Sequence, residues 1–329
     1  MRDEKETPNP MNAKKNIMTR YATVFKWLCA FMVLFFLFKR VDTAKVIEAM
    51  RYARMDLYLP MAIIFVILWF LIESQNLMFL FNLFGHNLSF REMRTIRGAS
   101  YLLMIINYNL GLGAVAWYLK KRNGIPLVRA SSVMFFYYFV ESVGITFFAM
   151  FGCMLIMGQA PHVYLKIVLI AGCMCLSYIT LFFMYRFLPA AGFLRRFREN
   201  PLFASFHEAT FSGYFKLSGL RVIYFVSFII FFFFGLQCFQ VHVPLITLTG
   251  LVPVIFFIGN IPITPFGIGT IQAAMLFFFA PYGPAENILS FSIVYSATLL
   301  FLRAPIGLIY MRKTDTGLKD IHHIDIQEA

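Results

Sequence analysis

Long apolar runs fill most of the chain, and polar residues are confined to the short segments between them. About six of these runs reach the roughly 20 residues that a helix needs to cross the hydrocarbon core of a bilayer. We therefore predict an all-α polytopic membrane protein whose full transmembrane helices cover about residues 21–38, 58–80, 129–157, 162–187, 220–238 and 288–311. An outer-membrane barrel would instead require alternating segments of about ten residues.

Two other apolar regions, 90–121 and 243–281, are interrupted by residues that disfavour a continuous helix. A proline inside a helix costs roughly 3 kcal/mol, and glycine permits positive φ and close backbone approach. The interrupting residues of the second region are Pro262, Pro265, Gly267 and Gly269. We predict that both regions are re-entrant broken-helix hairpins, because freed backbone groups are tolerated at membrane depth only inside protein or beside a polar cavity.

The two interruptions resemble each other, since each has a Gly-x-Gly sequence followed by an apolar helix-forming run. We predict that the helices restart near Ala114 and at Thr270, which could cap its helix. Broken helices in an inverted repeat that meet near mid-membrane are typical of transporters, and their free N–H groups bind anions. The predicted substrate-binding residues are Asn107, Asn109, Gly111, Gly113, Pro262, Pro265, Gly267, Gly269, Thr270 and Gln272. The alternative is close packing of crossing helices through small residues.

Among the ionisable residues inside predicted spans, three stand out by their depth, namely Glu73, Glu141 and Arg303. A charge at the bilayer centre costs roughly 2.5–3.5 kcal/mol, so these side chains should face protein or water. Each carboxyl group is either a coupling or headgroup contact or a neutral, hydrogen-bonded tie between helices. Arg303 either contacts substrate or snorkels to the membrane surface.

Composition agrees with this pattern, because 60% of the residues are hydrophobic and the mean hydropathy is +0.72. The formal net charge of +13 is explained by basic cytoplasmic loops and anionic lipids rather than by nucleic acid. The five cysteines lie in apolar segments, and no metal site or cofactor is expected.

Positively charged segments should face the cytoplasm. We therefore predict a cytoplasmic N-terminal tail over residues 1–20, a single membrane domain over 21–311 and a cytoplasmic C-terminal tail over 312–329. The expected location is the cytoplasmic membrane of a prokaryote. Residues 39–57 contradict the charge rule, since they hold five basic and three acidic residues yet fall on the external side.

The sequence from Pro262 to Gln272 is similar to the motif P-x-[ST]-P-G-G-[LI]-G-x-x-E. Weaker matches to an earlier motif lie at Asn107, Gly113, Tyr118, Lys120, Lys121, Gly124 and Ile125. Over about residues 20–312 the chain resembles the membrane region of lysylphosphatidylglycerol synthase/flippases, including stand-alone flippase-like proteins without a synthase domain. It departs from them at Phe266 and Gln272, at the early Pro and Arg, and at an Arg before Glu141. The resemblance implies the translocation half only.

We expect a lipid translocator that handles a phosphate-bearing lipid or a lipid-linked precursor, and not an enzyme. One alternative is an accessory protein that binds partner membrane enzymes of envelope lipid or glycan synthesis without transporting. A less favoured one is an intramembrane lipid-modifying enzyme, for which the sequence offers no HExxH motif or clustered His and Cys. The sequence names neither the lipid nor the oligomeric state.

Overall fold

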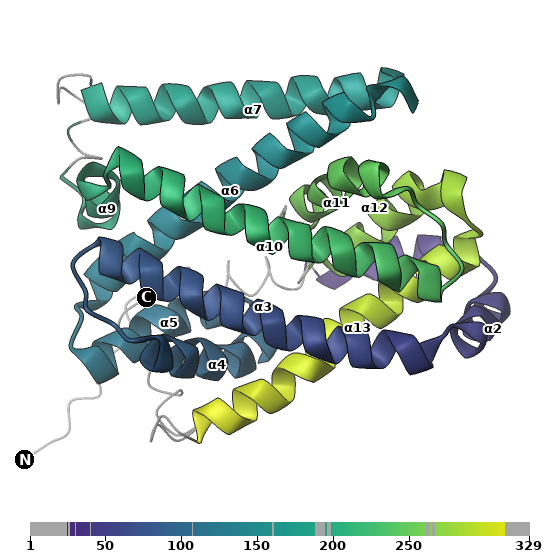
Figure 1. Cartoon of the computed structure of the whole chain (residues 1–329), viewed down its shortest axis with the longest axis horizontal. Helices are drawn as coiled ribbons and strands as arrows, with labels where there is room; N and C mark the ends of the chain where they lie inside the picture. The colour runs from purple at the N-terminus through teal and green to yellow at the C-terminus, as the bar shows by residue number, and fades with distance from the viewer. Residues whose placement is uncertain are drawn as a thin grey trace, which may run out of the picture.

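The computed structural model describes residues 25, 27–29, 31–39, 41–106, 108–159, 161–187, 195, 199–260, 264 and 267–312. Within this part of the chain the secondary structure is helical and no strand occurs, which confirms the predicted all-α class (Figure 1).

Five helices in the described part are long and apolar enough to cross a membrane. They are α3 (Met55–Leu83), α6 (Leu127–Leu155), α7 (Pro161–Phe187), α10 (Phe211–Cys238) and α13 (Ala285–Met311). Each covers one of the predicted spans. The remaining predicted span, 21–38, lies partly outside the described residues, which include an apolar helical stretch at 31–39.

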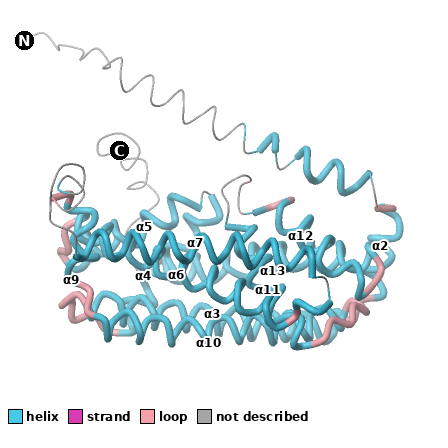
Figure 2. The backbone as a smooth tube through the Cα atoms, turned by 90° about the horizontal axis from the view of Figure 1, so that it is seen from above, coloured by secondary structure: helices cyan, strands magenta, loops and turns pink. Residues whose placement is uncertain are grey.

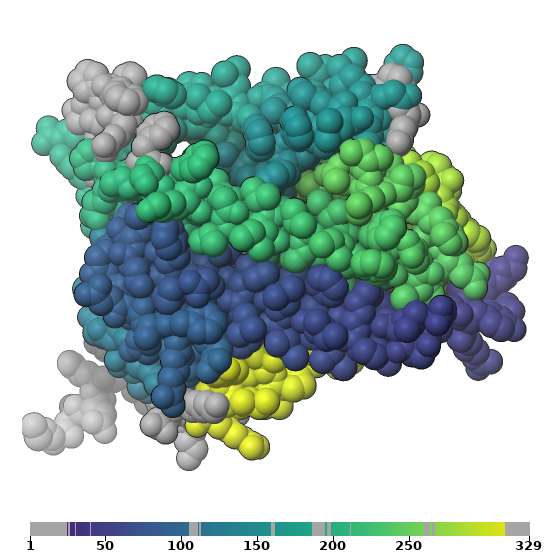
Figure 3. Space-filling model, in the orientation of Figure 1, coloured from purple at the N-terminus to yellow at the C-terminus, as the bar shows by residue number. Residues whose placement is uncertain are grey.

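Helices α3 and α10 lie side by side and antiparallel, and together they cover the middle of the face shown in Figure 3. At one end, the N–H of Arg54 donates to the carbonyl of Cys238 at 2.9 Å. At the other end, Leu83 packs directly on Gly213. Between them the ring of Trp69 stacks on a phenylalanine of α10, and its indole N–H donates to Ser227 Oγ at 3.0 Å.

Two pairs of shorter helices form hairpins. The first pair is α4 (Phe90–Ile106) with α5 (Tyr108–Asn123), and the second is α11 (Leu245–Asn260) with α12 (Thr270–Phe279). The two ends of the first hairpin meet where Asn123 Nδ2 donates to Glu92 Oε1 at 3.2 Å. The ends of the second meet where the His242 N–H donates to the Tyr282 carbonyl at 3.2 Å. Because α4 follows α3, and α11 follows the antiparallel α10, the hairpins enter the bundle from opposite ends (Figure 2).

The helix pairing repeats itself between the two halves of the chain. Helix α4 of the first half packs on α13 of the second, and α11 of the second packs on α6 of the first. The short helix α2 (Thr43–Tyr52) precedes α3 and packs on α13, whereas η2 (Pro201–Phe203) and α9 (Ala204–Glu208) precede α10 and pack on α6. Exchanging the halves therefore reproduces the pairing, as the predicted inverted repeat requires.

Glycines permit the two equivalent crossings to be close. A Cβ on Gly152 of α6 would lie 2.4 Å from the Cα of Gly250 in α11. At the α4–α13 crossing, a Cβ on Gly98 would lie 2.5 Å from the ring of Tyr310, and one on Gly307 would lie 3.0 Å from the backbone of α4. These contacts agree with the role of small residues at helix interfaces in membranes.

The structure confirms one predicted helix restart and corrects the other. Helix α12 begins at Thr270, after Gly267 and Gly269 with φ of 69° and 90°. Helix α5, however, begins at Tyr108, so the predicted restart near Ala114 is wrong. Gly111 lies inside α5, and a Cβ there would lie 1.9 Å from Met104 Cγ, so this glycine serves close packing of the hairpin.

Candidate functional site

Five charged side chains meet inside the bundle, one from each of five helices. They are Glu73 of α3, Arg97 of α4, Glu141 of α6, Arg221 of α10 and Arg303 of α13. Together with tyrosines and apolar residues they line a cavity of about 120 Å³. The contributing helices come from both halves of the repeat, so the cavity lies at the interface between the halves.

Glu73 is held by two donors from α4. Its Oε2 lies 2.9 Å from Arg97 Nη2 and accepts a hydrogen bond from Arg97 Nε at 3.0 Å. The same oxygen accepts a bond from the hydroxyl of Tyr101 at 2.6 Å. Glu73 and Arg97 are only 5% and 7% exposed. This is the geometry of a buried, hydrogen-bonded ion pair, the arrangement in which charges persist away from water.

Arg221 is shared between a carboxylate and aromatic rings. Its Nη1 donates to Glu141 Oε1 at 3.1 Å, and its guanidinium carbon lies 4.2 Å from the ring centroid of Tyr137. Arg221 is 4% exposed, and its buried Nη2 has no hydrogen-bond partner among the described residues. A buried donor without a partner costs roughly 1–3 kcal/mol, so this atom is available to an acceptor that enters the cavity.

Arg303 has no carboxylate within ion-pair distance in the described part of the chain. Its guanidinium carbon lies 5.2 Å from the ring centroid of Tyr101, and the side chain lines the cavity. It therefore points into the bundle and not toward the membrane surface. With two carboxylates facing three guanidinium groups, the cavity carries one excess positive charge.

The cavity lies well inside the bundle. Glu73 is ten residues before the end of α3 at Leu83, and Arg221 is ten residues after the start of α10 at Phe211, at the same end of the molecule. At 1.5 Å per residue this places both side chains about 15 Å along their helices from that end.

Both hairpins reach this cavity near their tips. Met104 of α4 and Phe256 of α11 line it, each a few residues before its helix is interrupted. Of the predicted break residues, Asn107, Pro262 and Pro265 lie outside the described residues, and Asn109 is described only as part of α5. Gly113 lies exposed in α5.

The predicted residues at the start of α12 are placed away from the cavity lining. Gln272 caps its own helix, since its Oε1 accepts from the Gly269 N–H at 2.6 Å while its Nε2 donates to Ser296 Oγ at 2.9 Å. The predicted capping role of Thr270 is wrong, because Thr270 is the first helical residue and its hydroxyl donates to the Gly267 carbonyl at 3.0 Å. At this helix start the N–H of Gly269 is thus bonded to the protein's own side chain.

A family model described as "Lysylphosphatidylglycerol synthase TM region" matches residues 23–307. The chain belongs to this family. A comparison with curated proteins finds no match. Membership indicates a function related to membrane lipid, in agreement with the multi-pass helical structure.

The sequence alone indicated three of the five charged residues of the cavity and missed Arg97 and Arg221. Arg97 falls among the basic residues at the start of the predicted re-entrant region 90–121, and Arg221 falls at the start of a predicted span. One signal was available, since two buried glutamates each require a cation or a proton. The partners are 24 and 80 residues away along the chain.

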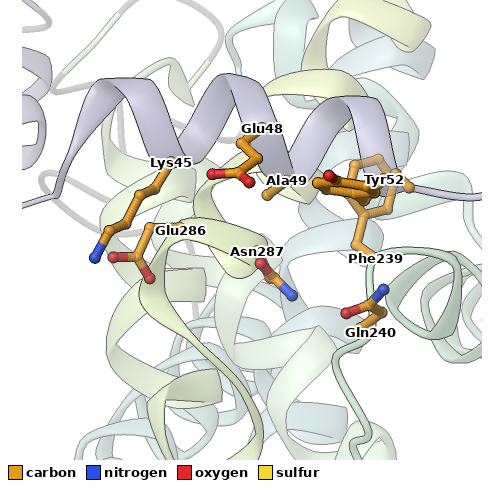
Figure 4. Close-up of a pocket in the computed structure, with 9 residues that line it drawn as sticks. Lys45, Glu48, Ala49, Tyr52, Phe239, Gln240, Glu286 and Asn287 are labelled. Carbon is orange, nitrogen blue, oxygen red and sulfur yellow. The ribbon is translucent and has the colours of Figure 1, made fainter.

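A second, larger cavity of about 330 Å³ lies at the other end of the molecule, between α2 and the start of α13 (Figure 4). Lys45 and Glu48 of α2 and Glu286 of α13 contribute its charged side chains. Lys45 and Glu48 are exposed, so their charges are solvated and need no ligand. The smaller, buried cavity is the stronger candidate site. No group of His, Cys, Asp and Glu suited to a metal occurs among the described residues.

Proposed function

We propose that this protein translocates a phosphate-bearing lipid, and that the headgroup passes through the charged cavity. The observation that carries the proposal is the excess of guanidinium groups over carboxylates in the cavity between the two halves of the chain. Arginine matches phosphate oxygens through two parallel N–H donors, and such charge-assisted bonds are strong where water is excluded. The acyl chains would remain in the bilayer beside the apolar outer faces of the helices.

The repeated architecture supports an alternating mechanism. The hairpins α4–α5 and α11–α12 would be re-entrant, each dipping into the membrane from one side. Transporters built from inverted repeats expose a fixed central site to the two sides by rocking one unit against the other. Here α3 and α10 would form the axis of this motion. The helix crossings α4–α13 and α6–α11 would alternate between two packing arrangements.

The distribution of charge supports an orientation with both termini in the cytoplasm. Basic residues gather where α3, α5 and α13 end and where α4 and α6 begin, for example Arg91, Lys120 and Arg129. The opposite end carries α2 and the start of α3, where basic residues are accompanied by acids, as in the exposed pair of Arg54 and Asp56 at 3.7 Å. The cytoplasmic membrane of a prokaryote, expected from the sequence, remains the proposed location, and the charge rule gives the proposed orientation in it.

The test is translocation by the purified full chain in proteoliposomes. Fluorescent phospholipids that differ only in their headgroups would be placed in both leaflets. The fraction of each lipid that is shielded from a membrane-impermeant quencher would be followed over time. We expect faster exchange of at least one anionic phospholipid than in protein-free vesicles. Exchange at the protein-free rate for every lipid, by folded protein and with a working control scramblase, would contradict the proposal.

A further inference from the structure

The charges of the cavity restrict the headgroup that it can hold. Glu73 is paired with Arg97 and Glu141 with Arg221, whereas the half-buried Arg303 has no carboxylate within ion-pair distance, so the described residues of the cavity carry one positive charge in excess. Uncompensated charge is costly in a low-dielectric interior. A ligand with a single negative charge restores neutrality. A dianion would leave one negative charge in excess, and a zwitterion would leave the original positive charge.

Two donor groups face the same space without acceptors. They are Nη2 of Arg221, which is buried and has no partner, and the guanidinium of Arg303, whose contact is with the ring of Tyr101. The two non-bridging oxygens of a phosphodiester share one negative charge, so each can accept from one arginine.

Both carboxylates of the cavity already face a cation, so an amine would have to share each of them with a guanidinium group. Glu73 Oε2 accepts from Arg97 and Tyr101, and Glu73 Oε1 lies 3.5 Å from the Tyr224 hydroxyl. Glu141 already accepts from Arg221. An ammonium group placed against Glu141 would lie beside a guanidinium, and like charges repel at such distances.

The volume of the cavity also restricts the headgroup that it can hold. A volume of about 120 Å³ lies below the roughly 300 Å³ at which pockets for drug-sized ligands begin. It suits a phosphate group and a short polar substituent but not a sugar on a pyrophosphate.

We propose that the cavity selects a lipid headgroup that is a phosphodiester with one net negative charge and no amine. The inference rests on the proposed function and names its substrate class. The proposed headgroup differs from that of lysylphosphatidylglycerol, the lipid in the family's description, whose headgroup carries amines.

The test measures binding independently of transport. Detergent-purified full-length protein would be titrated with dihexanoyl phosphatidylglycerol, dihexanoyl phosphatidylethanolamine, dihexanoyl phosphatidic acid and the lysyl ester of the first lipid. We expect the first to bind roughly tenfold or more tightly than the others, the ratio that one charge-assisted hydrogen bond supplies. Dimethyl phosphate, which has the same charge without acyl chains, should bind more weakly. Equal affinity for dimethyl phosphate would overturn the assignment to a lipid.

The variant Arg303→Gln removes the excess charge without breaking an ion pair, so it should fold. It should lose roughly tenfold in affinity for dihexanoyl phosphatidylglycerol, whereas Arg51→Gln on the exposed surface of α2 should keep it. Equal or tighter binding of either amine-bearing lipid, or unchanged affinity in Arg303→Gln, would overturn the inference. Selective binding without translocation would contradict the proposed function alone, and translocation of all lipids at one rate would contradict the selectivity alone.

Discussion

The hydroxyl of Tyr101 donates a 2.6 Å hydrogen bond to the carboxylate of Glu73. This bond joins α4, the first half of a hairpin, to α3, the long helix before it. The ring of Tyr101 makes a second set of contacts. The guanidinium carbons of Arg97 and Arg303 each lie 5.2 Å from its centroid. One side chain thus connects the buried ion pair to the uncompensated arginine.

Replacing Tyr101 with phenylalanine separates the hydrogen bond to Glu73 from the ring contact with Arg303. Tyr101→Phe keeps the ring over Arg303 and removes the bond to Glu73, and a hydrogen bond to a charged group contributes about 1.5–3 kcal/mol. We expect a lower midpoint temperature of unfolding in detergent and an affinity for dihexanoyl phosphatidylglycerol within about threefold of wild type, since Arg303 keeps its position. An unchanged midpoint would show that the hydrogen bond contributes nothing to stability.

The crossing of α6 and α11 depends on Gly152, and α6 itself supplies a control. A Cβ at Gly152 meets backbone of α11 at 2.4 Å, whereas one at Gly144 meets nothing within 4 Å. Gly152→Ala should destabilise the protein by about 1–3 kcal/mol through overpacking, and Gly144→Ala should be neutral or stabilise it by about 0.5–1 kcal/mol. Equal effects of the two substitutions on the unfolding midpoint would refute the close crossing.

Glu141 sets the charge of the cavity. Glu141→Gln would release Arg221 from its ion pair and raise the excess charge to two. We expect the preference to shift toward the dianionic dihexanoyl phosphatidic acid by about tenfold, or ~1.4 kcal/mol, relative to dihexanoyl phosphatidylglycerol. The matched control is Glu199→Gln, an exposed residue paired with Arg195. An unchanged ratio of the two affinities in Glu141→Gln would contradict the charge-balance argument.

His86 lies in the loop between α3 and α4 and gives a pH dependence. Burial, reinforced by the charge of Arg129, lowers the pKa of His86 below its ordinary value. The unfolded chain therefore binds a proton more readily than the folded chain. The stability that neutral His86 contributes is present above the unfolded pKa of about 6.5 and is lost as pH falls through the lower folded pKa. Unfolding midpoints between pH 7.5 and 5 should fall less steeply in His86→Gln than in wild type, and identical slopes would exclude this role.

The sequence could predict elements whose boundaries have local causes. Helix α12 begins where two glycines with positive φ follow a proline-rich stretch, and both features are visible along the chain. The start of α5 could not be predicted in this way, because Gly111 and Gly113 look like the same signal. Only the contact of Gly111 with Met104 shows that this glycine allows helices to pack and does not end one.

The candidate site was predictable only in part for a similar reason. Glu73, Glu141 and Arg303 stood out because charges are rare inside apolar runs. Arg97 and Arg221 did not, since each lies next to residues that belong to a basic loop or a helix end. Their identification required the pairing of α3 with α4 and of α6 with α10, which is a property of the packed bundle.

The most direct test of the account compares translocation by Arg303→Gln and Arg51→Gln in proteoliposomes of equal protein content. Each variant removes one positive charge, but Arg303 lines the buried cavity whereas Arg51 lies on the exposed surface of α2. The account predicts that Arg303→Gln slows the exchange of fluorescent phosphatidylglycerol by roughly tenfold or more, while Arg51→Gln exchanges it at the wild-type rate. Equal rates for the two variants would contradict passage of the headgroup through the cavity.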